Sequence, residues 1–313
     1  MKFNQLKEFI QYLEEQGQLK RISIEVDPYL QITEIADRVM KMPGGGKALL
    51  FEKVKGSDFP LLINAYGSYQ RMSWALGVPD MEDQARRLQE TLNTQTPQSF
   101  WEKLKILPKA AELARSLPKS RSSGPCQEKI WETVDLSKLP ILHCWPKDGG
   151  AFITLPMVIT KDPETGRRNV GLYRMQVLDK TSTAMHWQIH KVGKKHFEAY
   201  KKRGEKIPVA VAIGGDPVLT YTATAPLPEG IDEFLFAGFL KASPVEMVKC
   251  KSIDLEVPAS ADFILEGYID PTEAMVDEGP FGDHTGYYTP VEKFPRFHVT
   301  QITSRKDPIY LTT

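Results

Sequence analysis

Two carboxylates flank a rigid turn in the segment EGPFGDHTGYY, residues 278–288. Glu278 and Asp283 bracket Gly-Pro-Phe-Gly, whose glycines and proline favour a tight, irregular backbone. Two carboxylates held close together can have different pKa values and different roles in acid–base chemistry, and His284 would add a third titrating group. The alternative is structural, with Asp283 capping a turn and Glu278 a solvated charge at a strand edge.

A second candidate group lies in the segment RRNVGLYRMQ, residues 167–176, where a polar amide and a guanidinium stand among apolar neighbours. Asn169 and Arg174 are an odd number of positions apart, so on a regular strand their side chains would point to opposite faces. Both can serve one site only through a bulge, which Gly171 would permit. The alternative is an exposed arginine on a half-buried strand.

Two further segments contain residues with the chemistry of metal ligands. His186 and His190 in MHWQIHK are four positions apart and share a face on either a strand or a helix. Neutral imidazole is a common ligand of borderline metals. Glu233 stands at the start of an expected helix, where the helix dipole stabilises a carboxylate. Taken singly, a structural histidine and an ordinary first-turn charge are the simpler interpretations.

The elements that would position these residues change in character along the chain. Residues 4–16 have the apolar spacing of an amphipathic helix, with Asn4 as its cap and Gly17 as its end. The rest of the first 117 residues alternates between the two periodicities, as in an α/β domain. The further elements expected there are a strand at 22–26, a helix at 32–40 ended by the breaker 43–46, strands at 48–54 and 60–66, and helices around 81–93 and 98–117.

The polar segment PKSRSSGPCQ, residues 118–127, is the best linker candidate, because it lacks a hydrophobic period. Residues 128–313 are rich in strands, which favours a barrel or a sandwich. Two strands, 151–160 and 169–179, should form a hairpin through the turn DPETG. The other expected elements are an extended segment at 184–190, helices at 193–205 and 232–242, and strands at 207–215, 247–258, 261–269 and 296–304.

Composition limits the class of protein. The chain has 313 residues, and its 40 basic and 40 acidic side chains give a net charge of zero, so no global charge attracts nucleic acid or an anionic membrane. No apolar run reaches the ~20 residues of a membrane helix, and the first twenty residues are too polar for a signal peptide. Three cysteines without a CxxC motif indicate a reducing, cytoplasmic compartment. The last residues, DPIYLTT, begin a strand pattern without a stop signal, and we expect that the chain has lost its continuation.

The segments NVGLYRMQ, MHWQIHK, PLPEGIDEFLFAG, KSIDLEVPASADFILEGYI and EGPFGDHTGYY together resemble the UbiD family of decarboxylases, in order and in character. The likeness is greatest to the 3-polyprenyl-4-hydroxybenzoate decarboxylase branch of quinone biosynthesis. It extends over essentially the whole chain. The resemblance implies an α+β fold with an N-terminal α/β domain (1–117), a linker (118–127) and a split β-barrel that binds flavin (128–313). The family's C-terminal oligomerisation domain, and its lysine near the cofactor phosphate, would be absent from this chain.

The resemblance also implies a carboxy-lyase that uses prenylated FMN, bound through a divalent metal such as Mn²⁺ with K⁺ nearby. The implied metal ligands are Asn169, His190 and Glu233, and the catalytic trio is Glu278, Arg174 and Asp283. Arg174 would keep Glu278 ionised or orient the substrate carboxylate. Glu278 would protonate the ring carbon after CO₂ leaves. The implied cofactor-binding residues are Asn169, Gly171, Leu172, Tyr173, Arg174, Gln188, His190, Thr224, Ala225, Pro226 and Glu233.

The implied partners are a small aromatic acid, favoured as a polyprenylated 4-hydroxybenzoate, and a flavin prenyltransferase that supplies the cofactor. A homo-oligomer would form where the C-terminal domain is present, and a lipid-tailed substrate would bring the protein to a membrane surface. Two other functions stay open. One is a non-catalytic fragment or accessory subunit with an incomplete cofactor site. The other is an oxidoreductase that uses ordinary FMN, which the acidic pair with Arg174 disfavours.

Overall fold

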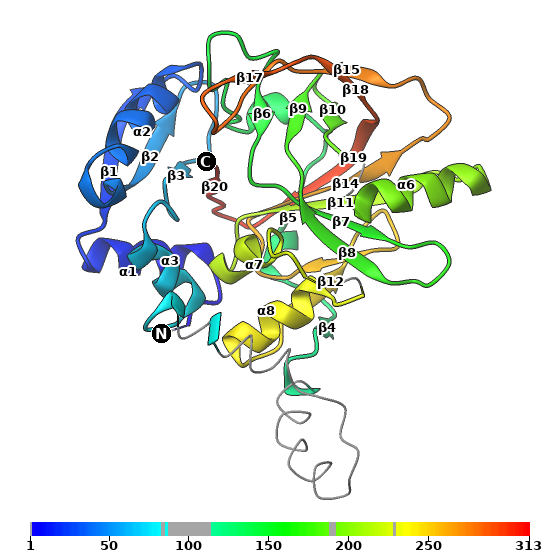
Figure 1. Ribbon diagram of the computed structural model, residues 1–313, viewed down its shortest axis with the longest axis horizontal. Helices are drawn as coiled ribbons and strands as arrows, with labels where there is room; N and C mark the ends of the chain where they lie inside the picture. The colour runs from blue at the N-terminus through cyan, green and yellow to red at the C-terminus, as the bar shows by residue number, and fades with distance from the viewer. Residues whose placement is uncertain (1, 83–84, 87–113, 188–191, 228–229) are drawn as a thin grey trace, which may run out of the picture.

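The computed structural model describes residues 2–82, 85–86, 114–187, 192–227 and 230–313, and it has a mixed α/β fold (Figure 1). The expected order, an N-terminal α/β part followed by a strand-rich part, is confirmed. The two helices expected around 81–93 and 98–117 fall largely outside the described residues.

The N-terminal part is a four-stranded sheet with helices beside it. The strands follow the order β1-β2-β3-β20, with β1 (Leu19–Val26) parallel to β2 (Ala48–Val54) and β3 (Leu61–Ile63) antiparallel to β2. The helices are α1 (Leu6–Glu15), α2 (Gln31–Met40) and α3 (Tyr69–Leu76). Asn4 is not the cap of α1 as expected, because Gln5 holds that position and the Asn4 backbone N–H donates to Glu8 Oε2 (2.7 Å).

The second part is built on a larger sheet. Its main strand order is β6-β9-β10-β19-β14-β11-β7-β8, and β5 pairs with β19. These strands are β5 (Lys129–Ile130), β6 (Phe152–Ile153), β7 (Met157–Lys161), β8 (Arg168–Leu172), β9 (Met175–Val177), β10 (Ser182–Met185), β11 (Ile207–Ile213), β14 (Phe263–Ile269) and β19 (Arg296–Ser304).

This sheet must curl, because β8 and β9 are separated by only Tyr173 and Arg174 and yet stand six places apart in the strand order. Six inter-strand steps would span ~29 Å in a flat sheet, whereas three Cα–Cα steps of the chain reach at most ~11 Å. The two residues between β8 and β9 therefore lie where the two ends of the sheet approach each other.

Smaller elements surround the curled sheet. The antiparallel ribbons β15–β18 and β16–β17 form the 276–294 region, and a three-stranded sheet has the order β13-β12-β4. The remaining elements are β4 (Lys119–Arg121), α6 (Val192–Arg203), α7 (Pro217–Thr222), α8 (Glu233–Lys241), β12 (Glu246–Lys249), β13 (Glu256–Pro258), β15 (Val276–Glu278), β16 (Phe281–Gly282), β17 (Tyr288–Thr289), β18 (Glu292–Phe294) and β20 (Tyr310–Leu311), with short 3₁₀ helices at Pro43–Gly45, Pro125–Gln127 and Leu136–Lys138.

One further expectation from the sequence is corrected. Residues 247–258 form two antiparallel strands, β12 and β13, instead of one. The turn between them is held by the buried Glu266, which accepts hydrogen bonds from the backbone of Lys251 (2.8 Å) and Ser252 (2.6 Å). Within the segment expected to be a linker, residues 118–127, β4 pairs in parallel with β12.

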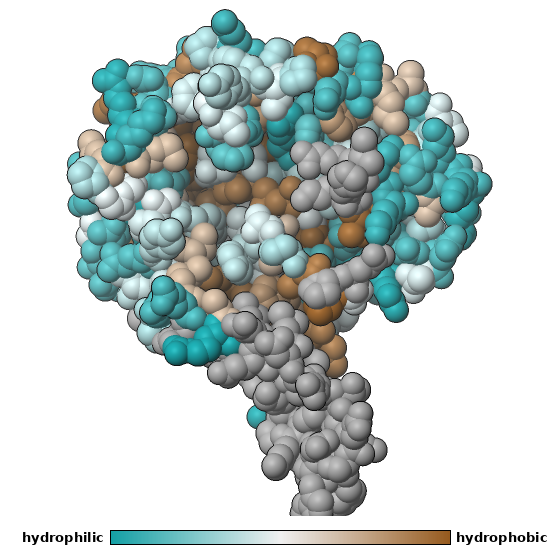
Figure 2. All heavy atoms as spheres, in the orientation of Figure 1, coloured by the Kyte–Doolittle hydropathy of each residue, from teal (hydrophilic) through white to brown (hydrophobic). Residues whose placement is uncertain are grey.

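One hydrophobic core joins the two parts. It contains Phe9 and Phe51 from the N-terminal elements together with Val211 and Phe263 from the curled sheet. The second core lies between the curled sheet and α7, α8, β12 and β13. In Figure 2, hydrophobic side chains form the floor of a hollow in front of the curled sheet, with hydrophilic side chains around it. Among the described residues, no helix is long and apolar enough to cross a membrane.

Candidate active site

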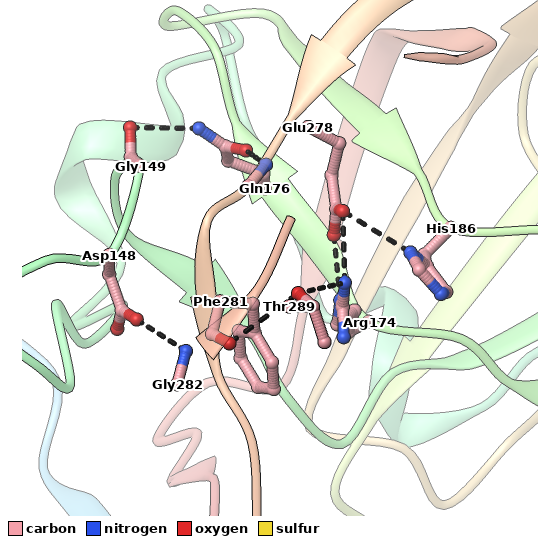
Figure 3. A network of polar contacts seen from close by, with 10 residues as sticks. Asp148, Gly149, Arg174, Gln176, His186, Glu278, Phe281, Gly282 and Thr289 are labelled. Atoms are coloured by element: carbon pink, nitrogen blue, oxygen red, sulfur yellow. Dashed lines mark hydrogen bonds and ion pairs between the residues drawn. The ribbon is translucent and has the colours of Figure 1, made fainter. Parts of the chain in front are cut away.

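A largely buried ion pair in the second part joins Arg174 to Glu278. Arg174 Nε donates to Glu278 Oε1 (2.7 Å) and its Nη2 donates to Oε2 (3.0 Å), a bidentate ion pair. The Glu278 side chain is 0% exposed and that of Arg174 is 14% exposed. Figure 3 shows the two side chains pointing toward each other, with the Phe281 ring near the guanidinium, whose carbon lies 4.3 Å from the ring centroid.

A third residue, His186, completes this group. Its Nδ1 lies 3.2 Å from Glu278 Oε2, and its ring lies against that of Phe294 at a centroid distance of 4.3 Å. Burial opposes ionisation of Glu278, but hydrogen bonds from His186 and Arg174 and the charge of Arg174 hold the pKa of the Glu278 carboxyl below its ordinary value. Glu278 is therefore a buried carboxylate that rests in its ionised form.

The Gly279–Gly282 turn is fastened to the curled sheet by side chains that the sequence analysis did not single out. Gln176 on β9 accepts from the Gly279 N–H (2.6 Å) and donates to the Gly149 carbonyl (2.9 Å), while Asp148 accepts from the Gly282 N–H (2.7 Å; Figure 3). A Cβ at Gly149 would lie 2.0 Å from the Gly279 carbonyl oxygen, so only glycine permits this approach. These contacts give the turn the fixed geometry expected from its sequence.

Asp283 does not join the Arg174–Glu278 pair in this structure. Its carboxylate accepts from the Thr285 N–H (3.3 Å) and lies 3.2 Å from His284 Nδ1. The His284 side chain is 91% exposed. Asp283 thus makes the local turn contacts of the structural alternative, whereas Glu278 does not.

The second group of expected site residues lies along β8. The register across Gly171 is continuous, so the bulge expected there is absent, and Arg174 leaves the strand because β8 ends at Leu172. The Tyr173 ring folds back over Gly171, where a Cβ would lie 2.3 Å from the Tyr173 hydroxyl oxygen. That hydroxyl lies 3.4 Å from Nδ2 of the buried Asn169.

β8 brings the start of α8 and the end of α7 to this group. The Val170 N–H donates to Glu233 Oε2 (3.0 Å), and the Leu172 N–H donates to the Ala223 carbonyl (3.1 Å). The expected cofactor-binding residues Thr224, Ala225 and Pro226 follow Ala223 directly. Burial raises the pKa of the Glu233 carboxyl to about 7.

The donor set at β8 and α8 suits a cation. Arg168 Nη2 pairs with Asp232 Oδ2 (2.7 Å), so its nearest carboxylate is that of Asp232 and not that of Glu233. A metal ion would stabilise the ionised form of the half-buried Glu233 carboxylate, whose pKa is raised by burial. Amide and carboxylate oxygens are ligands that Mn²⁺ accepts. Gln188 and His190 lie outside the described residues. Among the described residues, no three His, Cys, Asp or Glu side chains form a group that could hold a metal ion.

A separate cavity of about 1330 Å³ is lined by the glycine-rich segment 43–47, α3 and Tyr221 of α7. Lys20, Met42, Tyr69 and Tyr221 are among its lining residues. None of the residues expected to carry chemistry lines it, so the polar contacts above mark the candidate site instead.

Family models match most of the chain. A model described as the 3-octaprenyl-4-hydroxybenzoate carboxy-lyase Rift-related domain of UbiD matches residues 118–313, and one described as the N-terminal domain of the same carboxy-lyase matches residues 10–90. The chain therefore belongs to the UbiD family of carboxy-lyases. Neither model matches the residues between 90 and 118.

Sequence relatives of high identity extend beyond this chain. An uncharacterised protein of Aquifex aeolicus is 55% identical over 313 residues, and one of Archaeoglobus fulgidus is 52% identical over 314 residues. Each alignment covers 100% of this chain and 64% of the relative. The chain thus spans somewhat less than two thirds of the length of these relatives.

Solved structures of UbiD-class enzymes share the fold. An evolved dimeric form of HmfF from Pelotomaculum thermopropionicum, in complex with prenylated FMN, is 31% identical with a TM-score of 0.83, over 99% of this chain and 67% of that chain. The closed form of vanillic acid decarboxylase from Sedimentibacter hydroxybenzoicus is 28% identical with a TM-score of 0.85, over 99% of this chain and 64% of that chain. These matches agree with the curled-sheet fold described above.

Proposed function

We propose that the chain carries the active site of a decarboxylase that removes CO₂ from an aromatic acid with the help of prenylated FMN. The observation that carries this proposal is the buried Arg174–Glu278 pair, on a chain that belongs to the UbiD family. The solved relative HmfF is described in complex with prenylated FMN, and a second relative is named as a vanillic acid decarboxylase, which supports the cofactor and the reaction class.

The cofactor site we propose lies between β8, the start of α8 and the Ala223–Pro226 segment. Asn169 Oδ1 and the Glu233 carboxylate would bind a divalent cation such as Mn²⁺, with His190 as third ligand, and the cation would hold the flavin phosphate. K⁺ would bind nearby. When bound, prenylated FMN supplies an electron sink for the carbon that loses CO₂.

The chain's own residues would then position the substrate and move a proton. The Arg174 guanidinium can bind a carboxylate in a bidentate manner, that of Glu278 in the resting state or that of the substrate during binding. Loss of CO₂ leaves a carbon that needs a proton, and Glu278 would deliver it from its carboxyl group. Because Glu278 rests ionised, it must first take up a proton from solvent, and since both of its oxygens are engaged and its side chain is 0% exposed, Arg174 must release one of them before that can happen. Asp283 would act only after its loop, which is exposed over residues 284–288, has moved toward the pair.

The finer parts of the proposal concern substrate and partners. We favour a 4-hydroxybenzoate-type acid, with a polyprenyl tail that would bring the protein to a membrane surface, in quinone biosynthesis. A flavin prenyltransferase would supply the cofactor, and a homo-oligomer would form in the cytoplasm where the family's C-terminal domain is present. A domain boundary at residues 118–127 belongs to the same proposal.

Co-expression with a flavin prenyltransferase tests this function. We expect the purified chain to contain flavin with the mass of prenylated FMN and to release CO₂ from an aromatic acid in a panel that includes 4-hydroxybenzoate and vanillic acid. Prenylated FMN without CO₂ release would favour an accessory subunit. Unmodified FMN with oxidation of a reduced nicotinamide would favour an ordinary flavin oxidoreductase.

A further inference from the structure

His186 and Arg174 occupy matching positions just beyond the ends of two neighbouring strands, Arg174 directly before β9 and His186 directly after β10. On the β9–β10 ladder, Met185 is opposite Met175, so Arg174 and His186 are the next pair along it, and the His186 N–H nitrogen lies 3.3 Å from the Arg174 carbonyl oxygen. Both side chains reach Glu278 on β15. β15 and the ends of β9 and β10 thus deliver one residue each to a single buried contact.

The ribbon that carries Glu278 also holds the imidazole in place. β15 pairs with β18 in a register that puts Val276 opposite Phe294, two positions from Glu278. Residues two apart on a strand, and their cross-strand partners, share a face. The Phe294 ring and the Glu278 carboxylate therefore lie on one face of the ribbon, and His186 contacts both.

The two partners of Glu278 differ in what they can bond. A guanidinium is only a donor, so Arg174 can hold the carboxylate but has nothing to offer a carboxylic acid proton. An imidazole nitrogen donates in one tautomer and accepts in the other. His186 Nδ1 can therefore donate to the ionised Glu278 and accept from the protonated form at the same atom.

We propose that His186 is a positioning residue that holds the Glu278 carboxyl group in place in both of its protonation states. This inference rests on the proposed role of Glu278 as proton donor. Because Arg174 has to release an oxygen when Glu278 becomes protonated, the contact with His186 is the one that persists through the cycle. To accept from the protonated form, the neutral imidazole must give up its Nδ1 proton and take one up at Nε2, an exchange with solvent water that leaves its charge unchanged.

Other charged groups near the pair already have partners or face solvent. Glu292 on β18 is opposite Glu278 in the register but is exposed. Asp148 accepts from the Trp145 and Gly282 N–H groups, and Asp283 contacts His284 and Thr285. Among the residues that the structure describes, the side chains that contact the Glu278 carboxylate are thus Arg174 and His186.

Two variants separate the hydrogen bond from ring packing. His186→Phe keeps a planar ring against Phe294 but has no nitrogen. His186→Asn loses the ring but can place an amide nitrogen or oxygen near the position of Nδ1, and it does not titrate. The pKa of Glu278 is read directly by carbon NMR of glutamate-labelled protein, with the resonance identified by its loss in Glu278→Gln.

We expect the pKa of Glu278 to rise by about one pH unit in His186→Phe, because one donor to the ionised form is lost, and to stay near the wild-type value in His186→Asn. In the flavin-loaded enzyme, kcat should fall ~10-fold in His186→Phe with little change in KM, and ~3-fold or less in His186→Asn. His186→Leu replaces His186→Phe if the latter does not fold.

An unchanged Glu278 pKa in the apolar variant, or an equal rise in both variants, would overturn the proposal. Without any decarboxylase activity in the wild-type chain, the proposed function fails, but the titration still decides whether His186 holds Glu278.

Discussion

The two glutamates proposed to act in the site, Glu278 and Glu233, differ in the charge state that their surroundings favour. Glu278 receives two hydrogen bonds from Arg174 and one from His186, and its pKa lies below the ordinary value. Glu233 accepts one from the Val170 N–H, and burial raises its pKa to about 7. The Glu278 carboxylate has donors for both of its oxygens without any ligand, whereas a bound cation would stabilise the ionised form of Glu233. The two roles proposed for them follow from this difference.

The ion pair predicts a pH-dependent difference in stability between wild type and Glu278→Gln. At pH 7 the substitution leaves Arg174 without its anionic partner, which should cost about 3 kcal/mol. The folded pKa of Glu278 is depressed, so the stabilisation is present above the unfolded pKa near 4.5 and is lost as the pH falls through the folded pKa. Urea unfolding at several pH values should show the difference narrowing below pH ~4.5. A difference that stays constant down to about pH 3 would contradict this account.

The proposed cation site makes a separate prediction at Glu233. Glu233→Gln keeps the shape of the side chain but removes its charge, so affinity for Mn²⁺ should fall at least ~10-fold. Titration calorimetry with Mn²⁺ measures this. The matched control is Glu198→Gln, which changes an exposed acidic residue of α6. This variant should bind Mn²⁺ like the wild type. Equal affinity in all three proteins would place the metal elsewhere.

At the scale of elements, the sequence indicates most helices and strands but not how they meet. Helix α1 and strand β11 follow from the spacing of apolar residues along the local sequence, so both are expected. The hairpin of β7 and β8 was also expected from its turn residues. The break between β8 and β9 was not, because it depends on the closure of the curled sheet. Likewise the turn at 250–255 depends on Glu266, which lies on another strand.

The same reasoning explains what could be foreseen of the site. Glu278 and Arg174 stood out as charged residues in unusual local sequences, and the structure brings them together. The contact of His186 with Glu278 could have been found only from the register of β9 and β10, which no local pattern specifies. Gln176 and Asp148 support the turn through contacts with residues more than one hundred positions away along the chain.

The packing of Tyr173 over Gly171 predicts a coupled pair of substitutions on β8. Gly171→Ala would place a Cβ 2.3 Å from the Tyr173 ring and hydroxyl, so it should destabilise the protein by about 1–3 kcal/mol. In a Tyr173→Ala background the ring that blocks this Cβ is gone, so the same change should cost much less. Urea unfolding of the four proteins gives the coupling. A cost of Gly171→Ala that is equal in both backgrounds would show that the ring does not restrict this position.

At the scale of the whole molecule, the C-terminal strand β20 is part of the N-terminal sheet. β20 pairs in parallel with β3 of the N-terminal sheet, with Tyr310 opposite Leu61, although the whole curled sheet lies between these two strands in the sequence. The buried Asp262, just before β14, supports this return, since it accepts from the N–H groups of Ile309 (3.0 Å) and Gly215 (2.8 Å). One side chain thus connects the curled sheet to the segment that enters the N-terminal sheet.

Asp262→Ala should therefore destabilise the protein by about 2–3 kcal/mol, because two buried N–H groups lose their acceptor. Hydrogen exchange should also accelerate at the amides of Tyr310 and Thr312, which bond to Pro60 and Leu62. Asp307→Ala is the control, since Asp307 is 73% exposed and contacts only Lys7 at 3.7 Å among the ion pairs of the described residues. Unchanged exchange at both amides in Asp262→Ala would refute the connecting role.

The central claim is that Glu278 delivers the proton that replaces CO₂. The most direct measurement compares product formation and solvent-deuterium incorporation in wild type and Glu278→Gln, both loaded with prenylated FMN and with equal flavin content. We predict that Glu278→Gln retains flavin and metal but forms product at least ~10²-fold more slowly, the size of a general-acid contribution. Product formation and deuterium incorporation at near wild-type rates in Glu278→Gln would contradict the claim and move the donor role to another residue.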